Sequence, residues 1–156
     1  MYQPLLEKLV IKLQQNNIKI TCAESCTGGL LASVLTEVSG SSKWLDMSFV
    51  TYSNDAKHQL LGVELTTLAQ FGAVSEQTAE QMAKGALKKA NASYALSVTG
   101  IAGPTGGSEE KPVGTVCFGL SSLQKTFTYT QHFSGSRQEI RQQAVCFCLK
   151  ILLEII

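Results

Sequence analysis

Two adjacent side chains that can act as nucleophiles, Ser25 and Cys26, stand in a short polar segment of the chain. An apolar run ending at Ala23 precedes them, and a Gly-Gly pair followed by an apolar helical pattern from Leu30 comes after. This order predicts a strand, a tight turn and a helix. The first N–H groups of a helix have no partner within it, so they favour an anion or a developing oxyanion. The alternative is a structural turn that needs only a Ser or Thr cap and glycines.

A serine hydroxyl becomes a nucleophile only when a base takes its proton, and Lys57 is the candidate base. Lys57 follows an apolar strand pattern, so burial can lower the pKa of its amine and leave it neutral. His58 and His132 do not complete an obvious Ser-His-Asp set. Two alternatives stay open, a solvated surface lysine at position 57 and a cysteine hydrolase that uses Cys26.

Two further segments have the residue types of an anion site. The segment 100–107, Gly-Ile-Ala-Gly-Pro-Thr-Gly-Gly, is too rich in glycine for a regular element, and its backbone can approach a phosphate closely. It matches neither the P-loop nor the dinucleotide-binding pattern, and a plain long connection is the alternative. Arg137 and Arg141 lie four residues apart on one face of the last predicted helix, which suits either a phosphate or carboxylate or a solvated face.

The elements that must position these residues alternate between helix and strand. The periodicity and the turn residues predict helices over 5–15, 30–38, 56–61, 66–71, 75–90 and 137–155. They predict strands over 18–23, 47–52, 92–99, 113–120 and 125–133, the last two as a hairpin. We therefore expect a three-layer α/β/α domain over residues 1–156, with a mixed, mostly parallel sheet of about five strands.

The polar segments 24–29, 52–57 and 99–107 each follow one of three consecutive predicted strands. In sheets of this class the ligand binds beyond the carboxyl ends of the parallel strands. We therefore expect the three segments to meet there and to form one site.

Composition restricts the class of partner. A formal net charge of +1 and the lack of a Lys/Arg run give no reason to expect nucleic acid or an anionic membrane. No apolar run approaches the length of a membrane span, and the N-terminus does not resemble a secretory signal, so we expect a cytoplasmic protein. Five cysteines fit reduced thiols, and two isolated histidines support no metal site. A symmetric homodimer is common at this size.

Five ordered motifs over nearly the whole chain resemble the CinA C-terminal domain family. They are Ala23-Glu-Ser-Cys-Thr-Gly-Gly29, Phe49-Val-Thr-Tyr-Ser-Asn54 with Lys57, Gly72-Ala-Val-Ser75, Gly100-Ile-Ala-Gly-Pro-Thr-Gly-Gly107 and Lys111-Pro-Val-Gly-Thr-Val116. The resemblance is to the stand-alone form, which lacks the N-terminal molybdopterin-binding-like domain of full-length competence-damage proteins. It implies a three-layer fold and hydrolysis of the carboxamide of nicotinamide mononucleotide, without metal or cofactor.

The resemblance also implies roles for residues. The nucleophile falls on Ser25 and the base on Lys57, and the motif that carries the lysine contains Tyr52 and Asn54. Thr27, Gly28 and Gly29 are implied at the oxyanion or phosphate end. Nucleotide binding is implied for the Gly-rich loop and the last helix, at Gly100, Gly103, Thr105, Gly106 and Arg141. The rival from another class is a non-catalytic nucleotide-binding or regulatory module.

Overall fold

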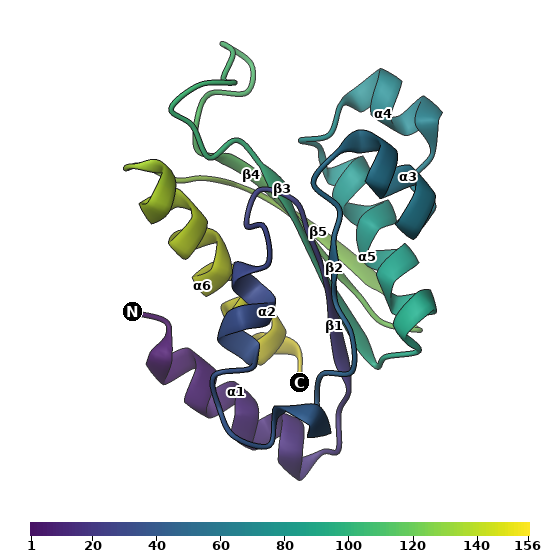
Figure 1. The fold of residues 1–156 in the computed structure, drawn as a ribbon, viewed down its shortest axis with the longest axis vertical. Coiled ribbons are helices and arrows are strands. Elements are labelled where there is room, and N and C mark those ends of the chain that lie inside the picture. The colour runs from purple at the N-terminus through teal and green to yellow at the C-terminus, as the bar shows by residue number, and fades with distance from the viewer.

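The computed structural model describes residues 1–156 and has one five-stranded sheet with helices on both faces (Figure 1). Helices α1, α2 and α6 cover one face, and α3, α4 and α5 cover the other. The helices are α1 (Gln3–Gln15), α2 (Leu30–Leu35), α3 (Asn54–Leu61), α4 (Leu65–Phe71), α5 (Glu76–Ala90) and α6 (Arg137–Ile155), with a 3-10 turn η1 (Ser41–Lys43). The strands are β1 (Ile20–Glu24), β2 (Phe49–Val50), β3 (Tyr94–Gly100), β4 (Thr115–Ser121) and β5 (Thr126–His132).

The strand order in the sheet is β2-β1-β3-β4-β5. The pairs β1–β2 and β1–β3 are parallel, whereas β3–β4 and β4–β5 are antiparallel. Four strands therefore run in the same direction and only β4 runs opposite to them. Two of the four strand pairs are parallel and two are antiparallel. The expected three-layer fold with a mixed sheet of five strands is confirmed.

Most of the apolar core lies between the sheet and the α1/α2/α6 layer. One cluster of 24 buried residues includes Leu6 from α1, Leu31 from α2, Phe118 from β4 and Leu149 from α6. The cluster under α3 and α5 has only 8 buried residues. Both helix layers are thus anchored to the sheet by apolar burial, which is the main favourable term in folding.

The expected elements are present, and two of them, β2 and α2, are shorter than expected by three residues or more. The strand expected over 47–52 is reduced to Phe49–Val50, because it lies at the sheet edge and pairs only with the end of β1. Helix α2 ends at Leu35, and the Thr36 hydroxyl bonds to carbonyls of its last turn, a local bond that competes with helix extension. Helix α6 begins at Arg137 as expected, because Ser136 and Glu139 form a capping box.

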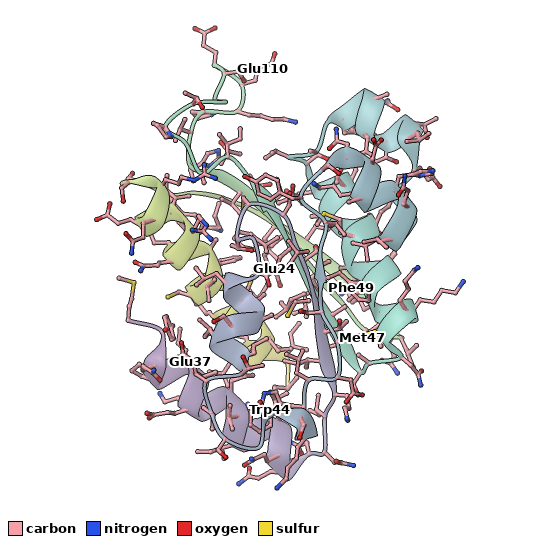
Figure 2. All side chains as sticks on the ribbon, viewed as in Figure 1. Glu24, Glu37, Trp44, Met47, Phe49 and Glu110 are labelled. Carbon is pink, nitrogen blue, oxygen red and sulfur yellow. The ribbon has the colours of Figure 1, made fainter.

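Trp44 closes the end of the molecule opposite the Gly-rich loop (Figure 2). Its ring is completely buried, and its indole N–H donates to the carbonyl of Leu35 at 3.0 Å. Glu110, which follows the Gly-rich loop in the connection to β4, projects from the other end of the sheet (Figure 2). None of the helices combines the length and the apolar character that a membrane span requires.

Candidate active site

The three polar segments expected to converge do meet at one edge of the sheet. They line a cavity of about 270 Å³ beyond the carboxyl ends of β1 and β3. Arg137, the first residue of α6, also lines this cavity. Eight of the twelve residues expected at the site line it, namely Ser25, Tyr52, Asn54, Lys57, Gly100, Gly103, Thr105 and Gly106.

Ser25 and Lys57 contact each other directly across this cavity. The Lys57 amine lies 2.8 Å from Ser25 Oγ, although the two residues are 32 positions apart in the chain. Ser25 comes directly after β1, and Lys57 lies on α3, which begins four residues after β2. Because β1 and β2 are parallel neighbours, their carboxyl ends bring the two side chains together.

The local sequence holds each of the two residues in place. The Ser25 N–H donates to the carbonyl of Val98 in β3 at 2.9 Å, so the serine backbone is tied to the central strand. Ser53 caps α3, since its hydroxyl accepts a hydrogen bond from the N–H of Ala56 at 3.0 Å. This cap sets where α3 starts and therefore where Lys57 points, one turn later.

Lys57 is only 1% exposed, and burial lowers the pKa of its amine to about 8 from an ordinary 10.5. Water solvates an ammonium better than a protein interior does, so removal from water favours the neutral form. No carboxylate pairs with this amine to restore its charge, because its partners are a hydroxyl and two backbone carbonyls. A substantial neutral fraction therefore exists near neutral pH.

The two carbonyls orient the neutral amine. The Lys57 amine donates to the carbonyl oxygens of Thr51 at 2.9 Å and Tyr52 at 3.2 Å. A neutral amine has two N–H groups and one lone pair, and carbonyls can only accept, so the lone pair is left for Ser25 Oγ. The serine hydroxyl has one other acceptor, the Tyr52 carbonyl, at the longer distance of 3.4 Å. The geometry thus favours proton transfer from Ser25 to Lys57.

Cys26, the rival nucleophile, lacks these features. It is 6% exposed, and burial raises the pKa of its thiol to about 12. The thiolate is the reactive form of cysteine, and a pKa this high leaves almost none of it at neutral pH. Its Sγ forms no hydrogen bond to a base, in contrast to Ser25 Oγ.

The first turn of α2 is not free to bind an anion, which corrects the expectation drawn from the strand–turn–helix pattern. Glu24, completely buried where β1 ends (Figure 2), accepts hydrogen bonds from the N–H groups of Leu31 at 2.8 Å and Ala32 at 3.0 Å. A carboxylate of the chain itself therefore occupies this helix terminus. The N–H groups that have no protein acceptor belong to the turn before α2, at Cys26, Thr27 and Gly29.

The other four residues expected at the site do not line the cavity. The Thr27 side chain is completely buried, and its hydroxyl donates to Glu24 at 2.6 Å. Gly28 and Gly29 have positive φ angles of 55° and 102°, which the tight turn before α2 requires. Arg141 donates from Nε to the Cys26 carbonyl at 3.2 Å and from Nη2 to the Thr27 carbonyl at 2.9 Å.

The Gly-rich loop presents backbone to the cavity. The N–H groups of Gly103, Thr105 and Gly106 have no protein acceptor, and all three residues line the cavity. A side chain at Gly103 would lie 2.4 Å from a methyl group of Val113, so only glycine lets the loop pack here. Arg137 holds this part of the loop by donating to the Gly103 carbonyl at 2.7 Å.

A family model described as the CinA C-terminal domain matches residues 2–156. The chain belongs to the CinA C-terminal domain family. A protein named nicotinamide-nucleotide amidohydrolase PncC from Enterobacter agglomerans is 57% identical over 135 residues, covering 86% of this chain and 82% of that protein. The protein of the same name from Escherichia coli is 51% identical over 149 residues, covering 95% and 90% of the two chains.

Solved structures of the CinA family share this fold. The crystal structure of competence/damage inducible protein CihA from Agrobacterium tumefaciens matches with a TM-score of 0.95 at 44% sequence identity. The match covers 98% of this chain and 94% of that one. The family resemblance that the five motifs indicated is confirmed.

Arg137 is a cavity residue that the assignment by resemblance missed, because it placed the nucleotide-binding arginine at Arg141. Besides the Gly103 carbonyl, Arg137 donates to the Tyr52 hydroxyl at 3.2 Å, so it joins the second and third polar segments. The sequence did contain a signal. Ser136 and Glu139 have capping-box spacing, which starts the helix at Arg137, and the preceding strand β5 runs parallel to β3 and so ends at the same sheet edge.

The residues around the cavity do not form a metal site. No group of three or more His, Cys, Asp or Glu side chains lies close enough to hold a metal ion. His58 instead has a structural contact, since its Nδ1 lies 2.8 Å from the Val63 carbonyl after α3. The chemistry that the described residues themselves offer is nucleophilic and acid–base.

Proposed function

We propose that this CinA-family chain hydrolyses the carboxamide of nicotinamide mononucleotide to nicotinate mononucleotide and ammonia. The observation that carries the proposal is the 2.8 Å contact between Ser25 Oγ and the buried Lys57 amine, whose pKa is lowered to about 8. The names of the similar proteins from Enterobacter agglomerans and Escherichia coli support the substrate class. The Ser/Lys mechanism rests on the geometry of this chain.

In the first step, neutral Lys57 accepts the Ser25 proton while Oγ attacks the amide carbon. A C–O bond forms, and the carbonyl electrons move onto oxygen to give a tetrahedral oxyanion. The unpaired N–H of Cys26, next to the nucleophile and on a residue that lines the cavity, is the candidate donor to this oxyanion. One such donor contributes about 3–4 kcal/mol to the stability of a transition state of this kind.

In the second step, the tetrahedral intermediate collapses and the C–N bond breaks. The Lys57 ammonium donates its proton to the departing nitrogen, so ammonia leaves and the amine is neutral again. Water then attacks the acyl ester on Ser25, with Lys57 taking a proton from the water and returning it to Oγ. The carboxylate product is released and the dyad is restored.

The shape of the cavity suits a substrate with one buried end and one exposed end. Its volume of about 270 Å³ is close to the lower limit of ordinary ligand sites, and Ser25 and Lys57 line it, so we place the pyridine carboxamide there. The ribose phosphate then extends toward the exposed Gly-rich loop, where free N–H groups and Arg137 are available. Tyr52, 60% exposed beside the cavity, offers an aromatic face for the ring.

The test is an ammonia-release assay on purified protein with nicotinamide mononucleotide, other pyridine nucleotides and free nicotinamide. We expect release from the mononucleotide, and a fall of at least about 10³-fold in kcat for Ser25→Ala and for Lys57→Ala, because each removes half of the dyad. Cys26→Ala is the matched control, since it changes the neighbouring side chain and is expected to retain activity.

Other results would contradict the proposal in distinct ways. Full activity in Ser25→Ala or Lys57→Ala would reject the dyad, and loss of activity in Cys26→Ala alone would favour a cysteine hydrolase. Calorimetric binding of a nucleotide without turnover by the native chain would favour a non-catalytic nucleotide-binding or regulatory module. Circular dichroism of each variant shows whether a loss of activity reflects unfolding.

A further inference from the structure

Arg141 contacts the segment that carries the nucleophile and does not line the cavity. It lies in the second turn of α6, half-buried, and its nearest partners are 114 and 115 positions away in the chain. Its Nε donates to the Cys26 carbonyl at 3.2 Å and its Nη2 donates to the Thr27 carbonyl at 2.9 Å. One guanidinium therefore holds two consecutive carbonyls directly after Ser25.

Holding a carbonyl also sets the direction of the next N–H. A trans peptide unit is planar, and its C=O and N–H point in opposite directions. The Cys26 carbonyl and the Thr27 N–H belong to one such unit, so the bond from Arg141 directs that N–H away from the guanidinium. The Ser25 carbonyl accepts from the Gly28 N–H at 3.1 Å, which fixes the Cys26 N–H in the same way.

A second charged group holds the same turn from β1. The buried Glu24 carboxylate accepts from the Thr27 hydroxyl and from the first N–H groups of α2. Thr27 is thus held by Glu24 at its side chain and by Arg141 at its carbonyl. The N–H groups of Cys26, Thr27 and Gly29 in this turn have no protein acceptor, and that of Cys26, which lines the cavity, directly follows the nucleophile.

We propose that Arg141 is a positioning residue: it holds the turn after Ser25 so that the N–H of Cys26, which lines the cavity, faces the reacting carbonyl oxygen. The proposal rests on the proposed amidohydrolase function, and it replaces substrate binding as the role of Arg141. Arginine suits this position because its planar fork places two donors at fixed spacing, whereas the lysine ammonium acts as a single point.

Steady-state kinetics of Arg141→Gln and Arg141→Lys with nicotinamide mononucleotide distinguish positioning of the turn from substrate binding. A positioning role affects the transition state, so we expect kcat to fall about 10²-fold in Arg141→Gln while KM changes less than about threefold. Arg141→Lys keeps the charge but not the fork, and we expect a smaller fall. Lys150→Gln is the matched control on the same helix, exposed and far from the turn, and we expect native kinetics.

Chemical rescue adds a readout that a purely structural role would not change. Ethylguanidine added to Arg141→Ala can occupy the vacated space and donate to the two carbonyls, and we expect it to raise kcat at least about fivefold over ethylammonium at equal concentration. A rise in KM of tenfold or more with kcat unchanged would overturn the proposal and return Arg141 to substrate binding. Unchanged kinetics in Arg141→Gln would also overturn it.

Hydrogen exchange keeps this test separate from the test of the proposed function. If the native chain releases no ammonia from any pyridine nucleotide, the function fails, but the turn can still be observed. We expect the amides of residues 26–29 to exchange at least about tenfold faster in Arg141→Gln than in Lys150→Gln, with the strands unchanged. Equal exchange in the two variants would show that Arg141 does not hold the turn.

Discussion

The Lys57 amine lies between a hydroxyl and two carbonyl oxygens, with no anion beside it. The cost of burying the ammonium is therefore not offset by an ion pair, and the pKa of the amine moves down to about 8. A carboxylate beside the Lys57 amine would instead raise its pKa and keep the lysine charged. The groups that surround the side chain are therefore what suit Lys57 to the proposed role of a base.

Activity should depend on pH through Lys57. In the proposed mechanism the neutral amine is the active form, and its pKa is about 8, so we expect kcat/KM to rise about tenfold per pH unit below that value and to level off above it. The sign follows from the lowered pKa, since protonation at lower pH removes the lone pair that accepts the Ser25 proton. Initial rates of ammonia release across the pH range measure the profile. A rate that falls between pH 7 and pH 9 in a folded protein would contradict this role.

At the scale of elements, the close packing of α3 against α5 holds Lys57 at the sheet edge. Gly85 of α5 lies against the end of α3, where an added Cβ would stand 1.9 Å from the Leu61 carbonyl oxygen. No real Cβ can occupy that position, so any larger residue must push α3 outward. Lys57 lies one turn before Leu61 and would move with it.

Gly85→Ala tests this contact. Alanine favours the helix by about 1 kcal/mol over glycine, but overpacking costs about 1–3 kcal/mol, and we expect net destabilisation with a fall in kcat. Urea unfolding and ammonia release measure the two effects. The exposed substitution Lys88→Ala on the same helix is the control and should leave both unchanged. Higher stability with native kcat in Gly85→Ala would mean that α3 is free to shift.

At the scale of the whole molecule, Glu76 ties the α5 layer to the edge strand β5. Its two carboxylate oxygens accept hydrogen bonds from the hydroxyls of Thr128 at 2.6 Å and Thr130 at 2.7 Å. The hydrogen bond from Thr128, followed by that from Thr130, lowers the pKa of this carboxyl from 4.5. Ionised Glu76 therefore helps to hold the hairpin against a helix more than 50 residues earlier.

This contact predicts a stability that weakens in acid. A lowered folded-state pKa means that the unfolded chain binds the proton more readily, so the contribution exists above pH 4.5 and disappears as pH falls through the folded-state value. We expect Glu76→Gln to be less stable than the native chain at pH 7, with a smaller difference at pH 3, by urea unfolding. Glu80→Gln, which removes only a surface pair with Lys84, is the control. An equal difference at both pH values would exclude this linkage.

The symmetric homodimer expected from the size of the chain remains a prediction. Sedimentation equilibrium at micromolar concentration checks it, and we expect twice the mass of one chain. A single-chain mass over the whole concentration range would reject the dimer. The proposed reaction does not depend on this result, because every residue given a role in it belongs to one chain.

The sequence by itself determined the order of the elements, the three-layer fold and the sheet edge at which the site lies. These features follow from periodicity, turn residues and the rule that ligands bind beyond the carboxyl ends of parallel strands, all of which are local or topological. The five motifs were also sufficient to indicate the family. The length of β2 could not be predicted from the sequence, because an edge strand ends where its partner stops pairing with it.

Only the tertiary structure decided which groups touch. The Lys57 amine contacts Ser25, and Arg137 lines the cavity whereas Arg141 donates to the carbonyls of Cys26 and Thr27. The N–H groups in the first turn of α2 donate to Glu24. Two arginines four residues apart look equivalent in a sequence, yet a turn of helix places their guanidiniums in different surroundings. Hydrogen-bond partners and pKa values depend on burial and on residues distant in the chain, so the local sequence pattern does not predict them.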